Sequence, residues 1–338
     1  MEGYEDNLRE VVGTPTVEKE GDAAFYSALR EVFGASFDEI RTFIDCLENL
    51  AARRGKAVMT VKRSEMIGLG NEHRRLTPAA SEALLGALTL KPRRGWREDI
   101  DGIDPRDLDL WRLRRSISVL RRPLLQIDEA SDPTLLLAPG LVRQAFLFMV
   151  GNYHDGSFQD WQLTPGMLKW KAREADRRGR TFSSSVADLL QRAGWSVAEP
   201  DIKVTKILGQ GFDTDPGDID VLAWKRSPDR VLAIECKDLQ FKRSLGEIGE
   251  QMADFRGETV GKKRDYLRKH LDRMALIRGH KATLARFIGW DTVETIESHL
   301  VFKHPVPVQY ALARMSAEVT VSTRATLLRT LEGPTAGR

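Results

Sequence analysis

Two short apolar runs in the second half of the chain constrain its fold more than any other feature. They read DIDVLAW and RVLAIECKDL, and the segment KRSPDR between them has the Pro-Asp chemistry of a turn. Strand interiors disfavour Asp, Glu and Lys. Both runs nevertheless carry such residues, namely Asp218, Asp220, Glu235 and Lys237. Residues that break a local rule in this way often belong to a functional site.

An antiparallel hairpin explains this placement of charge. If Trp224 opposes Val231, counting outward places Asp220 opposite Glu235, and Asp218 opposite the lysine of the second run. Because side chains alternate with period two, all four charged residues would project from one face. The other face would be apolar and turned to the core, formed by Ile219, Val221, Ala223, Leu232, Ile234 and Cys236.

The predicted pair of carboxylates indicates a metal site. Directly opposed side chains have Cβ atoms about 5 Å apart, and like charges at that separation repel. Mg²⁺ or Mn²⁺ prefers oxygen ligands, so we expect Asp220 and Glu235 to hold such an ion, with Asp218 assisting. Lys237 would place an ammonium group beside it, to orient a water or to stabilise charge on a phosphate. A metal, carboxylates and a lysine are the parts needed to hydrolyse a phosphodiester.

These residues resemble the core of the PD-(D/E)XK nuclease superfamily, in its restriction-endonuclease-like, Mrr-like and RecB-like branches. That family has an acid at the start of one apolar strand and an apolar-flanked Glu-x-Lys on the next. Asp220 matches the first acid, and residues 235–237 match the second motif. RecB-like relatives also carry Gln-x-x-x-Tyr on the following helix. Here Gln251 matches the glutamine, while Phe255 stands at the tyrosine position.

The resemblance implies a catalytic role for Asp220, Glu235, Lys237 and Gln251, although a core-edge amide is an equally good interpretation of Gln251. Many relatives carry a glutamate on the first helix, just after an aromatic residue, where this chain has Ser183. The third acidic ligand is therefore missing or comes from elsewhere. The choice between one and two metals stays open.

The chain is predicted to form two domains. The resemblance covers roughly residues 180–310 and implies an α/β fold, a restriction-endonuclease-like mixed sheet flanked by helices, for residues 161–338. Residues 1–160 are expected to form a mainly α-helical domain of unknown role, because DAAFYSALREVFG and FDEIRTFIDCLENLAARRG have apolar residues at helical spacing. The turn-rich segment 151–166 marks the boundary.

Basic runs on both sides of the nuclease-like core indicate contact with nucleic acid. The run at 169–180 also includes Trp170, and a second lies at 262–281. The residues expected to bind phosphate are Lys169, Lys171, Arg177, Arg178, Lys262, Lys263 and Arg264. A third run, 112–122, is threaded with leucine and isoleucine, so we expect a structural or interaction role for it. The net charge of +3 is too close to balance to indicate a partner by itself.

Other interpretations of these residues are weaker. An EF-hand calcium loop starting at Asp213 would require glycine at 218 and glutamate at 224, where the chain has Asp and Trp. Strand alternation turns Cys236 into the core as a packed thiol. The six histidines lack ligand spacing, and His270 and His280 are expected at the surface. The two cysteines form neither a disulfide framework nor a zinc pattern.

The sequence therefore predicts a Mg²⁺- or Mn²⁺-dependent nuclease, an endonuclease that acts in restriction, phage defence or repair. The resemblance to this superfamily favours DNA over RNA as the substrate. The alternative is a non-cleaving nucleic-acid-binding or assembly module that retains the fold. No apolar stretch is long enough for a membrane helix, and the acidic start is no signal peptide, so a cytoplasmic location is expected. The oligomeric state stays open: the chain could form a homodimer or a larger defence or repair assembly through the helical domain.

Overall fold

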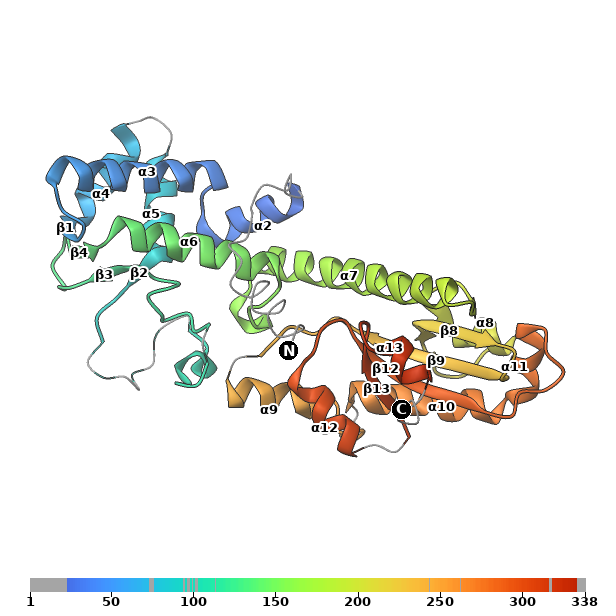
Figure 1. Cartoon of the computed structure of the whole chain (residues 1–338). Coiled ribbons are helices and arrows are strands. Elements are labelled where there is room, and N and C mark those ends of the chain that lie inside the picture. The colour runs from blue at the N-terminus through green and yellow to red at the C-terminus, as the bar shows by residue number, and fades with distance from the viewer. Residues whose placement is uncertain are drawn as a thin grey trace, which may run out of the picture. The chain divides into compact units, whose positions relative to one another are not determined.

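The computed structural model describes residues 23–332, with gaps at 73–75, 94, 96–97, 99, 101–102, 113, 243, 262 and 316–317. The chain forms two compact units that meet within the long helix α7 (Pro165–Arg192), drawn in green in Figure 1. The first unit ends at Ala175 and the second begins at Asp176. Each unit has its own hydrophobic core.

The first unit is mainly helical, as expected, but it also contains a sheet. Its elements are α2 (Ala23–Phe33), α3 (Phe37–Arg54), β1 (Met59–Lys62), α4 (Arg63–Glu72), α5 (Pro78–Leu88), β2 (Thr89–Leu90), the 3₁₀ turn η1 (Pro105–Leu108), β3 (Leu124–Gln126), β4 (Thr134–Leu137), α6 (Pro139–His154), the 3₁₀ turn η2 (Asp160–Gln162) and the start of α7. The strands pair in the order β1-β4-β3-β2, with only β2 and β3 parallel.

Local sequence signals set the helix ends of this unit. Ser36 accepts from the backbone N–H of Glu39, whose carboxylate accepts from the N–H of Ser36, so a capping box opens α3. The same helix ends at Gly55 in the left-handed conformation, which glycine adopts without a Cβ penalty. Thr77 caps α5 just before Pro78 at its first position. These signals orient apolar faces that pack into one core.

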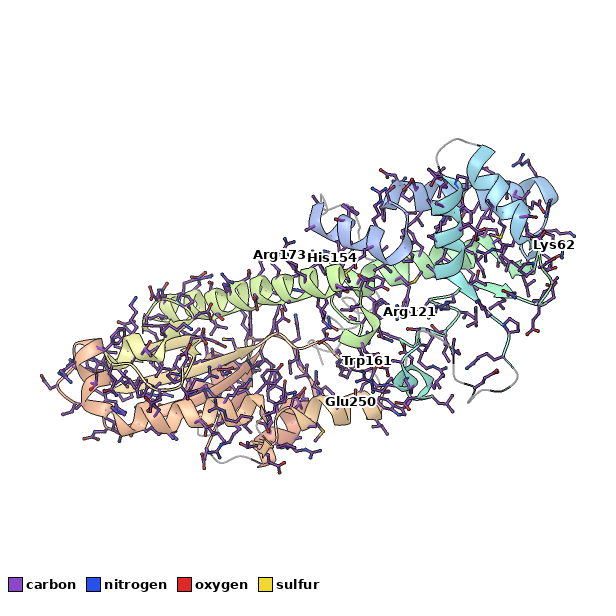
Figure 2. All side chains as sticks on the ribbon, turned by 180° about the vertical axis from the view of Figure 1, so that it is seen from behind. Lys62, Arg121, His154, Trp161, Arg173 and Glu250 are labelled. Carbon is purple, nitrogen blue, oxygen red and sulfur yellow. The ribbon has the colours of Figure 1, made fainter. Side chains whose placement is uncertain are left out.

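The basic run at 112–122 has the structural role that its leucines and isoleucines indicated. Arg121, labelled in Figure 2, is buried and donates from Nη2 to the Tyr153 hydroxyl at 2.9 Å. Arg122 donates to the carbonyl of Thr89 at 3.1 Å. These arginines therefore bind the extended segment to the core of the first unit.

The second unit is an α/β structure built on a mixed sheet. Its elements after α7 are β5 (Ser196–Val197), β6 (Ile202–Lys203), α8 (Val204–Leu208), β7 (Asp218–Ile219), β8 (Val221–Lys225), β9 (Arg230–Lys237), α9 (Leu245–Ala253), β10 (Thr259–Val260), β11 (Lys263–Arg264), α10 (Tyr266–Gly279), α11 (Lys281–Ile288), β12 (Ile296–Phe302), α12 (Pro307–Met315), β13 (Thr320–Thr323) and α13 (Leu327–Glu332). The main sheet has the order β13-β12-β9-β8-β5.

The central hairpin of this sheet has the register that the sequence predicted. Trp224 pairs with Val231, and β8 runs antiparallel to β9. On its other edge β9 runs parallel to β12, which in turn runs parallel to β13. Helices cover both faces, with α7 on one side and α10 on the other (Figure 1). Such two-sided cover explains why the strands are apolar almost throughout.

One part of the predicted side-chain pattern is wrong. Five of the six expected core residues pack together against α7 and α13, namely Val221, Ala223, Leu232, Ile234 and Cys236. Ile219 instead joins the cluster on the opposite face, which also holds Leu222 and Ala233. Ile219 and Val221 would share a face in a regular strand, so the pleat is interrupted at Asp220. This break separates β7, which pairs with β6, from β8.

Two elements at the ends of this unit complete its fold. Residues 181–192 are the end of the 28-residue α7. β12 ends at Phe302, and α12 begins at Pro307 after a turn. Proline at the first helical position is well tolerated because its missing N–H would have no partner there.

The two-sided cover of the hairpin predicts where its stability resides. Leu232→Ala, at a fully buried position of β9, should lower the free energy of unfolding by about 2–5 kcal/mol, because it removes apolar contacts and leaves a cavity. The matched control is Leu245→Ala, since Leu245 is 88% exposed; it should change stability by about 0.5 kcal/mol or less. Denaturant unfolding of both variants measures the difference. Equal losses would contradict the described packing.

Candidate active site at the end of the central hairpin

Asp220 lies at the break between β7 and β8 and is buried. Its Oδ2 accepts a hydrogen bond from the backbone N–H of Cys236 at 2.6 Å. The side chain is therefore bonded across the hairpin rather than projecting freely. Burial, and secondarily the charge of Glu235, raise the pKa of Asp220 from 3.8 to about 7. The charge of Glu235 thus opposes the ionisation of Asp220.

Glu235 is the most enclosed charge of the site, with 4% of its surface exposed. Its Oε1 lies 2.7 Å from Nζ of Lys237, and its Oε2 lies 2.5 Å from Nη2 of Arg273. Burial opposes the ionisation of Glu235, but Lys237, Arg273 and His270 outweigh it and lower its pKa. Glu235 is therefore an ionised carboxylate held between two cations.

Arg273 comes from α10 and was not expected at the site. Besides Glu235, it reaches the hairpin through Nη1, which donates to the carbonyl of Asp218 at 2.6 Å. A signal for it does exist in the sequence. His270, Met274 and Ile277 are buried at helical spacing, and residue 273 lies one turn from His270, on the same side of the helix. The basic helix therefore turns one arginine towards the sheet.

His270 corrects a second expectation, because it is fully buried rather than at the surface. Its Nε2 lies 2.8 Å from the hydroxyl of Ser298, and its Nδ1 lies 3.7 Å from Oε2 of Glu235. Burial is the main cause that lowers the pKa of His270 to about 4. Near pH 7 the ring is therefore neutral. His280 is half-buried and bonds the carbonyl of Leu276 through Nδ1 at 2.9 Å.

Lys237 ends β9 and faces an aromatic ring. Its Nζ lies 4.9 Å from the centre of the Tyr266 ring, within cation–π range. Burial favours the neutral amine, but Glu235 and Asp220 overcome this effect and raise the pKa of Lys237. The side chain is therefore an ammonium group, fixed between a carboxylate and a ring.

Two further acids lie around this centre. Asp218 is partly exposed, with its Oδ1 3.8 Å from Nη1 of Arg273. Asp201, which the sequence analysis missed, has a left-handed φ of 57° and donates its N–H to the carbonyl of Asp220 at 2.9 Å. Burial raises the pKa of Asp201, while a hydrogen bond with Ser183 opposes this. A carboxyl group thus lies beside the serine that replaces the relatives' glutamate.

Cys236 and Gln251 occupy the surroundings of the centre. The Cys236 thiol is buried in the core between the sheet and α7, as predicted. Gln251 of α9 is also buried and donates to the carbonyl of Gln240, three residues beyond Lys237, at 3.1 Å. Its Oε1 has no hydrogen-bond partner among the described residues. Gln251 therefore supports the segment that leaves the site.

The basic residues expected to bind nucleic acid fall into different environments. In the first unit, Lys171 donates to the carbonyl of Phe158 and pairs with Asp160 at 2.9 Å. Trp170 is buried and packs on Phe25 with ring centres 4.8 Å apart, so this tryptophan belongs to the core. The other expected residues with described positions are exposed or half-buried, namely Lys169, Arg177, Arg178, Lys263 and Arg264. Lys262 lies outside the described residues.

A cavity of ≈ 420 Å³ adjoins the centre, between the loop 214–217 and α10. We call it the Arg273 cavity, because Arg273 both lines it and contacts Glu235. Gly217 has a φ of 88°, a conformation that favours glycine. A Cβ at this position would lie 3.6 Å from Nη1 of Arg273, so the loop passes close to the guanidinium. Arg273 is thus common to the cavity lining and to the charged centre.

Comparisons with known proteins identify the family. A family model described as "Anti-phage protein Upx-like" matches residues 2–328. The chain belongs to the Upx-like family. Membership in a family of anti-phage proteins supports phage defence among the three settings that the sequence left open. Neither the comparison with curated proteins nor that with solved structures found a match. Within the described part of this Upx-like protein, every helix is too short or too polar to cross a membrane.

The donor chemistry of the Upx-like centre fits a divalent cation in part. Asp220 and Glu235 offer carboxylate oxygens, and the raised pKa of Asp220 marks a carboxylate that a further cation would stabilise. Among the described residues, however, no three acid, histidine or cysteine side chains lie close enough to hold one ion. Mg²⁺ commonly binds through one or two carboxylates, with water and phosphate completing its shell. The residues therefore suit a Mg²⁺ or Mn²⁺ bound with few protein ligands.

The raised pKa of Asp220 predicts an unusual pH dependence of stability. A carboxyl whose folded pKa exceeds its unfolded pKa stabilises the fold at low pH, and this contribution is lost as the pH rises through about 7. Asp220→Asn stays neutral and can still accept from the N–H of Cys236. Its free energy of unfolding relative to wild type should rise between about pH 5 and pH 8, by on the order of a few kcal/mol.

Denaturant unfolding in EDTA at both pH values measures this effect. Asp229→Asn makes the same change at an exposed position in the turn of the same hairpin and should follow wild type. Parallel pH dependence of Asp220→Asn and wild type would show that residue 220 is already ionised in the folded protein.

Proposed function

We propose that this Upx-like protein is a metal-dependent nuclease of phage defence that hydrolyses phosphodiester bonds, with DNA favoured as substrate. The observation that carries the proposal is the convergence of Asp220, Glu235 and Lys237 at one end of the central hairpin. Their order along the chain and their strand positions resemble the PD-(D/E)XK pattern. The mixed, helix-flanked sheet is compatible with a restriction-endonuclease-like fold.

Each residue has a defined task in this proposal. A divalent ion bound by Asp220 and Glu235, with Asp218 at its edge, would polarise the phosphate and favour ionisation of water. Lys237, an ammonium group fixed by Glu235 and Tyr266, would orient the attacking water or stabilise charge on the phosphate. Arg273 keeps Glu235 ionised although it is buried. In this proposal Gln251 does not contact a reacting atom; it binds the backbone of the segment that follows β9, at Gln240.

A second candidate is a nucleic-acid-binding or assembly module that does not cleave. Both oxygens of Glu235 already have cationic partners, Lys237 and Arg273. A guanidinium in that position supplies the positive charge that a metal would otherwise bring. Such a protein would retain the fold and the basic surface without the chemistry.

Single substitutions separate the two candidates. Asp220→Asn, Glu235→Gln and Lys237→Ala should each reduce cleavage by about 100-fold or more, because each removes a group that acts on the reacting phosphate or water. Binding should persist, since the basic surface is unchanged. The assay incubates the chain with plasmid, single-stranded DNA and RNA, each in Mg²⁺, Mn²⁺ or EDTA.

Asp229→Asn is the matched control and should cleave as wild type does. Wild-type activity in any one of the three site variants would remove that residue from the mechanism. A wild-type protein that binds nucleic acid but cleaves none of the substrates with either metal would favour the non-cleaving module.

A further inference from the structure

The Arg273 cavity has the size and charge of an anion-binding site. Its volume of ≈ 420 Å³ lies within the range of about 300–1,000 Å³ that is usual for small-ligand pockets. Three cationic residues line it, Arg264, Lys269 and Arg273, against the two acids Asp215 and Asp272. The balance of charge at its wall is therefore positive.

The acids of the cavity already have cationic partners. Asp272 pairs with Arg264 at 3.1 Å and with Arg268 at 2.7 Å, and Asp215 lies 3.6 Å from Nζ of Lys203. Lys269, by contrast, is exposed: its Nζ lies 5.7 Å from the centre of the Tyr266 ring, and it forms no ion pair within the described part of the chain. Its ammonium is therefore available to an external anion.

Arg273 supplies a second, independent indication of a ligand. Its side chain is 10% exposed, and Nε has no hydrogen-bond acceptor among the described residues. A guanidinium has five N–H donors, and the bonds to Glu235 and Asp218 use only two of them. Buried donors without acceptors are rare in folded proteins. Each terminal nitrogen of Arg273 keeps one further N–H, and Arg273 lines the cavity, so the guanidinium can still donate to an anion there.

We propose that the Arg273 cavity binds a phosphate group of a nucleic-acid strand, held by Arg273 and Lys269. This site deepens the proposed function and rests on it for the identity of the strand as substrate. Because Arg273 contacts both the cavity and Glu235, the bound phosphate lies next to the candidate catalytic centre. The cavity thereby positions the strand relative to Asp220, Glu235 and Lys237.

Binding in EDTA tests the site apart from any cleavage. The probes are a short fluorescent single-stranded oligodeoxynucleotide and the free nucleotide dAMP, which carry the same phosphate chemistry. Lys269→Gln should weaken oligonucleotide binding several-fold, and the slope of log K against log salt should become shallower by about 0.7, as for loss of one single-strand phosphate contact. Arg286→Gln, an equal change of charge at an exposed position on α11, should leave the slope unchanged.

Glu235→Gln tests the same site by the opposite change of charge. It removes a negative charge that lies 2.5 Å from Nη2 of Arg273, so the variant should bind the oligonucleotide more tightly than wild type. An unchanged salt slope in Lys269→Gln would overturn the site, as would weaker binding by Glu235→Gln. If Lys269→Gln impairs only dAMP binding, the cavity belongs to a free nucleotide and the assignment to a strand is wrong.

These outcomes are distinct from those of the cleavage assay. A protein that cleaves nothing but shows the Lys269 effect would refute the nuclease proposal and retain the phosphate site. A protein that cleaves nucleic acid but shows no effect of Lys269→Gln would support the nuclease proposal and refute the phosphate site.

Discussion

A buried but ionised carboxylate, Glu235, is the constraint on which the rest of the candidate site depends. Removing a carboxylate from water is costly unless cations and hydrogen bonds compensate. Here one cation comes from the same strand, Lys237, and the other from a helix far along the chain, Arg273. The sheet and α10 are therefore joined by charge as well as by apolar packing, while burial raises the pKa of Asp220.

Much of the site could be predicted from sequence because its information is local. The alternation in two adjacent runs determines the hairpin register, and Asp220 and Glu235 directly follow its last pair, Val221 and Ile234. Cys236 was placed in the core by the same alternation. Arg273 and His270 were missed because they reach Glu235 from α10. The apolar spacing of α10 indicates which side of the helix faces the sheet, but not which strand residues that side contacts.

The fold shows the same division between local and long-range information. Apolar residues at helical spacing predicted α2 and α3, and capping interactions set the ends of α3 and α5. The strands of the first unit are two to four residues long, too short for an alternation to be recognised. The break at Asp220 was also invisible, because it arises when β7 pairs with β6 instead of continuing the main hairpin. The long α7 begins at Pro165, at the end of the turn-rich segment 151–166.

The position of Cys236 makes the site observable by thiol chemistry. Its sulfur is buried against α7, and burial together with Asp220 and Glu235 raises its pKa, so the thiolate that reacts with alkylating reagents is scarce in the closed protein. The other cysteine, Cys46, is buried in the first unit. Alkylation at Cys236 thus requires β9 to separate from α7, and its rate reports how often the strand that carries Glu235 and Lys237 opens.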